Sequence, residues 1–309
     1  MNFEPLTKEL KKEKINTVII NHNGKNIFEY YKNMKQKEKL HKLNSCTKSV
    51  MSILIGIAID RQYLDTIHTP VHHFFPEVFQ NQTDTRKNDI TIYHLLTMTE
   101  GLNFPEFGEW NCFAPMIYHH NIVKFVINRP MEHPVGKHMN YNSGCSHILS
   151  SILQLVTKTK TEDFANEYLF KPIGIKEYTW YLDKMKINKG ADGLVLKAED
   201  MMKIGQLMLQ NGTINGKSII SADWIKETTK PNLMTYDFIG HYGMHWWVNK
   251  IDERKDFSDD NTYYFALGFG GQYIIVLPVK NMVITITSDI YSDSLKPMRI
   301  IRKSLFNGT

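Results

Sequence analysis

Hydrophobic residues follow a strand-like pattern at both ends of the chain. Near the N-terminus, the β-branched run Thr17–Asn21 and the aromatic-rich run Asn26–Tyr31 flank the turn signal His22-Asn23-Gly24, and together they predict a β-hairpin. Near the C-terminus, Tyr273–Leu277 and Met282–Thr287 are apolar runs separated by a short polar segment. Their spacing predicts a second pair of neighbouring strands.

Between these strands the pattern is mostly helical. Ser49–Tyr63 is apolar on nearly every face, which predicts a buried helix rather than a surface helix. Residues 294–306 predict a closing amphipathic helix. Helical periodicity also occurs in four segments separated by Pro- and Gly-containing loops: His94–Met98, Ser146–Val156, Glu162–Leu169 and Met201–Leu209.

The distribution of these elements predicts how the chain folds. Because the two terminal sets of strands need partners, the simplest arrangement pairs them in one antiparallel sheet flanked by helices. The helical middle then forms an inserted all-α lobe, which makes the fold α/β (α+β). We expect residues 1–65 and 226–309 to build the α/β lobe and residues 66–225 to build the helical lobe.

Composition and charge exclude several classes of protein. The 309 residues are 42% hydrophobic and 22% charged, as expected for a protein with a packed core. The net charge of +5 is spread along the chain, and the densest basic run, Lys8–Lys14, also carries glutamates and predicts a solvated helix. No basic face with interleaved aromatic residues is evident, so we expect no nucleic-acid partner.

Cysteine usage and the N-terminal residues bear on location. Cys46, Cys112 and Cys145 have no regular spacing, which argues against a disulfide framework and favours a reducing compartment. The N-terminal residues lack the apolar segment of a signal peptide, and no window is apolar enough to cross a membrane. We therefore expect a cytoplasmic protein without a membrane partner.

The tetrapeptide SCTK, from Ser45 to Lys48, has the form S-x-x-K at the entrance to the predicted buried helix. Residues three apart share a helix face, so the hydroxyl and the amine can lie side by side. The helix N-terminus favours a developing oxyanion, and burial lowers a lysine pKa enough for the amine to accept the serine proton. The alternative is that Ser45 or Thr47 caps the helix and Lys48 points to solvent.

Two further segments carry candidate chemistry. Tyr141 and Ser143 lie in a Y-x-S loop that can place a phenol and a small polar group in a cleft, although a packed tyrosine in a turn has the same pattern. Gly268-Phe269-Gly270 runs into a strand, where glycine lets another backbone approach closely. The N–H of Phe269 can then face that of Ser45 as an oxyanion donor, or the segment is a β-turn without a ligand.

The order S-x-x-K, then Y-x-[SN], then a Gly-rich strand segment resembles the serine β-lactamase and penicillin-binding superfamily. His94–Leu102 (HLLTMTEGL), Pro134–Gly144, Gly193–Leu209, Tyr242–Trp247 (YGMHWW) and Gly268–Gln272 (GFGGQ) are similar to the class C branch, including 6-aminohexanoate-dimer hydrolases and family VIII esterases. The resemblance spans roughly residues 15–300. It implies a site in the cleft between the two lobes.

The resemblance also implies roles for individual residues. Ser45 would be the acylated nucleophile, Lys48 the general base and Tyr141 a proton relay. Ser143 would stand where the family often has asparagine, and the amides of Ser45 and Phe269, next to Gly268, would form the oxyanion hole.

The chief departure from the family is Ala266, which stands where penicillin-recognising members place the Lys or His that helps to hold the substrate carboxylate. Loss of such a charge-assisted contact costs about 1.5–3 kcal/mol. We therefore expect a serine hydrolase that acts through an acyl-enzyme on small esters or amides. The alternatives are a β-lactamase or DD-peptidase, and an acyl-enzyme sensor or degenerate binding protein.

Other residue types give weaker signals. The pairs His72-His73 and His119-His120 point their rings to different faces, and we expect no metal and no cofactor. Trp110, Trp246 and Trp247 could line an apolar acyl pocket, although tryptophan packs in cores more often. Trp110, in a loop of the expected helical lobe, is the candidate for substrate contact.

Overall fold

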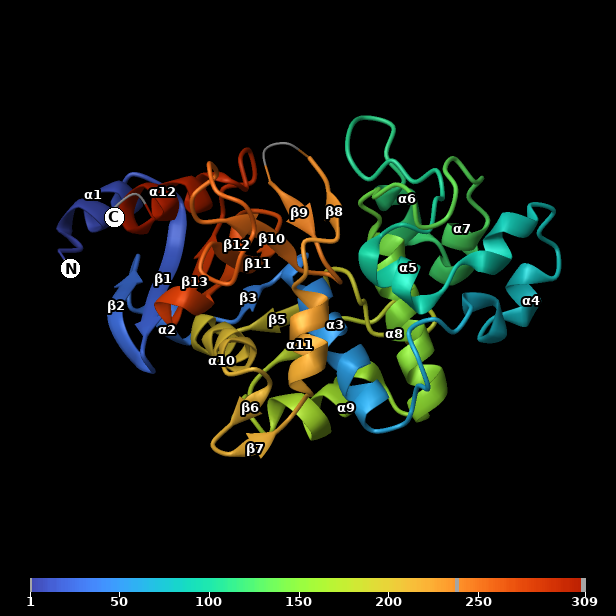
Figure 1. The fold of residues 1–309 in the computed structure, drawn as a ribbon, viewed down its shortest axis with the longest axis horizontal. Helices are drawn as coiled ribbons and strands as arrows, with labels where there is room; N and C mark the ends of the chain where they lie inside the picture. The colour runs from blue at the N-terminus through green and yellow to red at the C-terminus, as the bar shows by residue number, and fades with distance from the viewer. Residues whose placement is uncertain (1, 237–238, 307–309) are drawn as a thin grey trace.

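The computed structural model describes residues 2–236 and 239–306. Its main feature is a large antiparallel sheet built from both ends of the chain (Figure 1). Among the described residues the strands lie in the order β2 (Lys25–Tyr31), β1 (Ile15–His22), β13 (Met282–Ser288), β12 (Gln272–Leu277), β11 (Thr262–Gly268), β10 (Trp247–Lys250), β9 (His241–Tyr242) and β8 (Leu233–Met234). The pairing of β1 with β13 joins the two termini, as the terminal strand patterns predict.

The remaining strands are short. One small sheet has the order β3 (His41–Lys42), β5 (Leu194–Leu196) and β4 (Thr179–Trp180), and β6 (Thr213–Ile214) pairs with β7 (Lys217–Ser218). The helices are α1 (Glu4–Lys11), α2 (Lys35–Glu38), α3 (Cys46–Asp60), α4 (Pro76–Phe79), α5 (Ile92–Thr97), α6 (Phe113–Tyr118), α7 (Ile122–Ile127), α8 (Ser143–Thr157), α9 (Thr161–Ala165), α10 (Ala198–Leu209), α11 (Ala222–Thr228) and α12 (Lys296–Leu305). Short 3₁₀ turns occur at Val71–His73, Thr85–Asp89 and Pro278–Lys280, and a π-turn at Asn166–Phe170 extends α9.

The sheet is buried on both faces, which explains the continuous apolar runs of its central strands. In β12, Ile274 and Val276 belong to the core shared with α3 and α10, whereas Tyr273 and Ile275 belong to a second core that includes residues of α1 and α12. This division follows the twofold period of a strand. The expected fold class, an antiparallel sheet flanked by helices, is confirmed.

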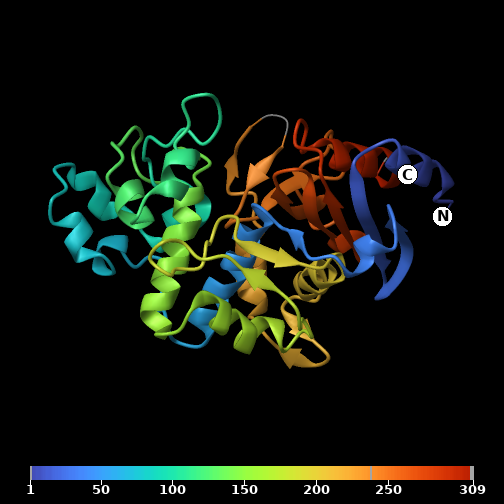
Figure 2. The same cartoon turned by 180° about the vertical axis from the view of Figure 1, so that it is seen from behind.

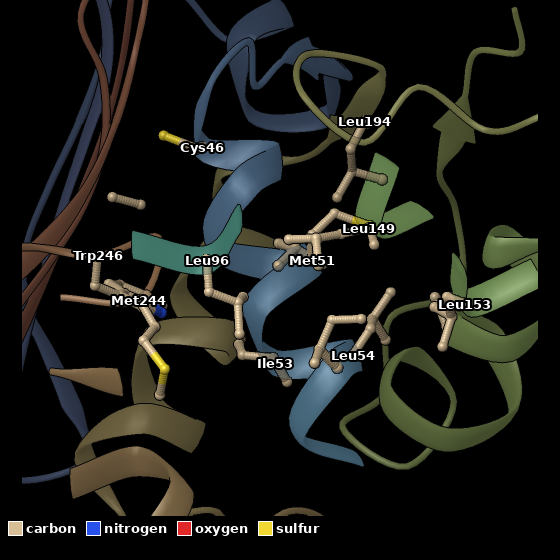
Figure 3. Close-up of a cluster of buried hydrophobic side chains, with 14 of the residues drawn as sticks. Cys46, Met51, Ile53, Leu54, Leu96, Leu149, Leu153, Leu194, Met244 and Trp246 are labelled. Carbon is tan, nitrogen blue, oxygen red and sulfur yellow. The ribbon is translucent and has the colours of Figure 1, made fainter. Parts of the chain in front are cut away.

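Helix α3 lies between the sheet and the helical lobe. Every residue from Cys46 to Ala58 is buried, because α3 packs against β11 and β12 on one side and α8 on the other. Figure 3 shows Met51, Ile53 and Leu54 of α3 with side chains from the neighbouring elements. The predicted buried helix is therefore confirmed, and its first turn is held in a fixed position between the two parts of the molecule.

Helices α4–α8 form a lobe on one side of the molecule, whereas the sheet with α1 and α12 forms the other side (Figures 1 and 2). Helix α10 lies within the 66–225 range expected for the helical lobe, but it packs against β1, β12 and β13. The small sheet β3-β5-β4 draws two of its strands from the same range.

Candidate active site

Ser45 and Lys48 meet at the start of α3. Ser45 occupies the N-cap position, and its side chain does not cap the helix. The Lys48 amine donates hydrogen bonds to Ser45 Oγ at 2.9 Å and to the carbonyl oxygen of Ala191 at 3.1 Å. Lys48 is 1% exposed, so it does not point to solvent. The helix thus presents a hydroxyl and a buried amine side by side.

The environment of Lys48 favours its neutral form. Burial lowers the pKa of the Lys48 amine, because a charge loses its hydration in the interior. The nearby carboxylates of Glu106 and Asp192 oppose this effect and raise the same pKa. A neutral amine in hydrogen-bond contact with a serine hydroxyl can accept its proton, and the two carboxylates can stabilise the ammonium that results.

Tyr141 completes a group of three polar side chains. Its ring stacks between those of Phe107 and Trp247, with centroid distances of 5.7 and 5.8 Å, and it is 6% exposed. The Lys48 amine lies 5.0 Å from the Tyr141 ring centroid. Burial raises the pKa of the Tyr141 phenol, while a hydrogen bond with Ser45 opposes that rise. Tyr141 is therefore a protonated phenol next to the serine hydroxyl.

Ser143 is buried and does not line the pocket described below, because its polar groups are directed at Glu106. Its hydroxyl donates to Glu106 Oε1 at 2.5 Å and its backbone N–H donates to Glu106 Oε2 at 3.0 Å. Burial raises the pKa of Glu106, while the charge of Lys48 opposes the rise. Nothing in the sequence marks Glu106 as a site residue, since Ser143, the partner that holds it, lies far along the chain.

The Gly-rich segment lies close to the residues before Ser45. A Cβ atom on Gly268 would lie 2.1 Å from the carbonyl oxygen of Leu43, so only glycine permits this approach. Asn44 Nδ2 donates to the carbonyl oxygen of Phe269 at 2.6 Å, which ties the two segments together. Among the described residues, neither the N–H of Ser45 nor that of Phe269 takes part in a backbone hydrogen bond outside the regular elements.

A pocket of about 520 Å³ opens beside these groups. Ser45, Tyr141 and Phe269 line it, together with Glu106 and Asp192. Lys48 does not line the pocket and contacts Ser45 from the protein interior.

The three tryptophans considered as pocket residues, out of five in the chain, lie in different surroundings. Trp247 lines the pocket, Trp246 is buried in the core and Trp110 is 88% exposed. Three residues that the sequence suggested for substrate binding, Trp110, Ser143 and Gly268, are not among the described residues that line the pocket. Phe107, three residues before Trp110 in the same loop, lines the pocket instead.

Within residues 2–236 and 239–306, no group of three or more His, Cys, Asp or Glu side chains is placed to hold a metal ion. No helix in the described part of the chain is long and apolar enough to cross a membrane.

The motifs, the two-part fold and the serine–lysine–tyrosine cluster define a protein of the β-lactamase class. The chain belongs to the beta-lactamase family, whose model matches residues 14–298. This finding confirms the resemblance inferred from the ordered motifs.

Particular relatives are distant in sequence. The 6-aminohexanoate-dimer hydrolase of Paenarthrobacter ureafaciens is 21% identical over 281 residues, which cover 83% of this chain and 68% of that protein. Another curated relative is matched over 58% of its length. The structure is similar to that of EstCE1, a hydrolase with promiscuous acyltransferase activity (TM-score 0.78, 14% identity, 98% and 97% of the two chains). It is also similar to a penicillin-binding protein from Bacillus halodurans (TM-score 0.74, 17% identity, 96% and 99%).

Proposed function

We propose that this protein is a serine hydrolase that forms an acyl-enzyme at Ser45 and acts on small esters or amides. The observation that carries the proposal is the 2.9 Å contact between the Lys48 amine and Ser45 Oγ beside a pocket of about 520 Å³. A lysine in the interior is costly unless it has a partner or a role. Membership of the beta-lactamase family supports this role.

Acylation follows from the arrangement of the groups. Neutral Lys48 takes the proton of Ser45 as Oγ attacks the substrate carbonyl carbon. The N–H groups of Ser45 and Phe269 donate hydrogen bonds to the oxyanion that forms. As this intermediate collapses, the bond to the leaving group breaks, Tyr141 gives its proton to the departing alcohol or amine, and the Lys48 ammonium returns a proton to Tyr141. The acyl group stays on Ser45.

Deacylation uses the same groups in reverse order. Water attacks the acyl carbon and gives up a proton through Tyr141 and Lys48, and Ser45 regains its proton as the carboxylic acid leaves. The carboxylates of Glu106 and Asp192 raise the pKa of Lys48, so they stabilise the ammonium that forms with each tetrahedral intermediate. We assign them an electrostatic role.

The segment from Ala266 to Gly268, which stands for the third motif of the family, favours esters or amides over penicillin-type substrates. Ala266 is fully buried in the core, so this position offers no cation for a substrate carboxylate. A β-lactamase or DD-peptidase remains the rival enzyme class. Turnover of nitrocefin at a rate comparable with that of simple esters, or stable labelling of Ser45 by a fluorescent penicillin, favours the rival.

The test is hydrolysis of p-nitrophenyl acetate and butyrate by the wild type and by Ser45→Ala. Ser304→Ala, which removes an exposed hydroxyl on α12, is the matched control. We expect Ser45→Ala to lose nearly all activity and Ser304→Ala to keep it. Equal slow hydrolysis by the wild type and Ser45→Ala contradicts the proposal. Stoichiometric acylation of Ser45 without turnover indicates the acyl-enzyme sensor instead.

We also propose a cytoplasmic location. Cys46, Cys112 and Cys145 are all unpaired and buried, as is typical of proteins from a reducing compartment. Fractionation of the native host tests this, and recovery with secreted proteins contradicts it.

A further inference from the structure

The walls of the pocket beside Ser45 are mainly apolar. They come from both parts of the molecule, so an occupant is enclosed by the helical lobe on one side and by the sheet on the other. Besides Phe269, the apolar lining residues are Phe107, Phe113, Ile239, Trp247, Leu267 and Leu295. A volume of about 520 Å³ is much more than an acetyl group fills and falls in the range of pockets that enclose drug-sized ligands.

The ionisable side chains of Asp, Glu, Lys, Arg and His that line the pocket are all acidic. Of the described residues that line it, Glu106 and Asp192 are the acidic ones, and none is Lys, Arg or His. Lys48 does not offset this for a ligand, because its amine is enclosed behind Ser45 and the carbonyl oxygen of Ala191. A substrate carboxylate placed here would lose its hydration next to two acidic side chains.

From these two observations we infer that the enzyme selects uncharged esters or amides whose acyl group is apolar and longer than butyryl, and that it discriminates against acyl groups ending in a carboxylate. The inference rests on the proposed hydrolase activity and adds a substrate class to it. The apolar acyl group lies against the aromatic and aliphatic wall, and the scissile carbonyl lies at Ser45.

The size of the expected effect of acyl-chain length on kcat/KM can be worked out from the burial of each added methylene group. Transfer of a methylene group from water to an apolar pocket corresponds to about a twofold to fourfold gain in kcat/KM when the group is bound in the transition state. Like-charge repulsion and desolvation predict that a terminal carboxylate lowers kcat/KM about tenfold or more.

The first experiment compares p-nitrophenyl acetate, butyrate, hexanoate and octanoate with the mono-p-nitrophenyl ester of adipic acid, all below their micelle-forming concentrations. We expect kcat/KM to rise about twofold to fourfold per methylene from acetate to hexanoate, and the adipate ester to fall about tenfold or more below hexanoate. A flat or falling series overturns the inference, as does equal hydrolysis of the adipate and hexanoate esters. Absence of any Ser45-dependent hydrolysis contradicts the proposed function instead.

One more substrate separates the effect of apolarity from simple charge attraction. The p-nitrophenyl ester of 6-aminohexanoate carries a cation where hexanoate carries hydrogen. The inference predicts that it is hydrolysed no faster than hexanoate, because the ammonium must be desolvated against an apolar wall. A tenfold preference for the amine-terminated ester overturns the inference, since the two acidic residues would then set the specificity.

A pair of variants on α6 tests the charge argument. Phe113 lines the pocket, whereas Tyr118 lies on the same helix, is 73% exposed and does not line it. We expect Phe113→Lys to raise the adipate-to-hexanoate ratio of kcat/KM about tenfold and Tyr118→Lys, which adds the same charge outside the pocket, to leave it nearly unchanged. Melting curves verify that both variants fold. An equal ratio in the two variants overturns the inference.

Discussion

Glu100 is a fully buried carboxyl group, and its ionisation couples the stability of the protein to pH. Its Oε1 accepts a hydrogen bond from Asn142 Nδ2 at 2.7 Å, and the Cys145 thiol is a further hydrogen-bond partner of the carboxyl group. Burial raises the pKa of Glu100 from its ordinary value of 4.5 to about 7. The folded protein therefore holds a proton here that the unfolded chain has already lost.

The contribution of Glu100 to the free energy of unfolding follows from its pKa values in the unfolded and folded states. One pKa unit corresponds to 1.36 kcal/mol, so a rise from 4.5 to about 7 corresponds to about 3 kcal/mol. Because the pKa is raised on folding, this stability is fully present below pH 4.5. It is lost progressively as the pH rises to about 7, and at higher pH the folded protein must bury a carboxylate.

Glu100→Gln tests this reasoning, since the amide keeps the shape and an oxygen acceptor for Asn142 but cannot ionise. We expect the free energy of unfolding of the variant, relative to the wild type, to increase by about 3 kcal/mol between pH 4.5 and pH 8. Urea titrations followed by tryptophan fluorescence at both pH values measure it. Glu77→Gln, at an exposed position on α4, controls for removal of a charge. A difference between Glu100→Gln and the wild type that stays the same at both pH values refutes the reasoning.

Three other predictions concern the site and its support. Lys48→Arg should lower kcat/KM for p-nitrophenyl butyrate about 10²–10⁴-fold, since arginine stays protonated; near-normal activity contradicts the role of Lys48 as a base. Glu106→Gln should move the acidic limb of the pH–rate profile to lower pH, because the Glu106 carboxylate raises the pKa of Lys48; an unchanged limb contradicts this coupling. Gly268→Ala should destabilise the protein by about 1–3 kcal/mol and reduce esterase activity, because the added Cβ would meet the carbonyl oxygen of Leu43. An unchanged urea midpoint together with unchanged activity contradicts this close approach.

The terminal hairpin and the buried helix are predictable from the sequence because their signals are local. Asn23 and Gly24 adopt positive φ values of 52° and 78°, as the turn between β1 and β2 requires. Helix α3 is apolar on all faces because it is enclosed between the sheet and α8. In both cases, neighbours in the sequence carry the information.

Other features depend on contacts between distant segments. Strands β8 and β9 have two residues each, too few for a period to be recognised. The position of Glu106 is set by hydrogen bonds from Ser143, and the requirement for Gly268 comes from Leu43. Such contacts become visible only when the chain is folded, so the sequence indicates Ser45, Lys48 and Tyr141 but not the carboxylate beside them.

The central claim is that Lys48 activates Ser45 as a nucleophile. A fluorophosphonate probe followed by intact mass and peptide mapping tests it without knowledge of the substrate. We expect one adduct per chain, on the peptide that contains Ser45, absent in Ser45→Ala and formed far more slowly in Lys48→Arg. A folded wild-type protein that forms no adduct, or forms one at a residue other than Ser45, contradicts it.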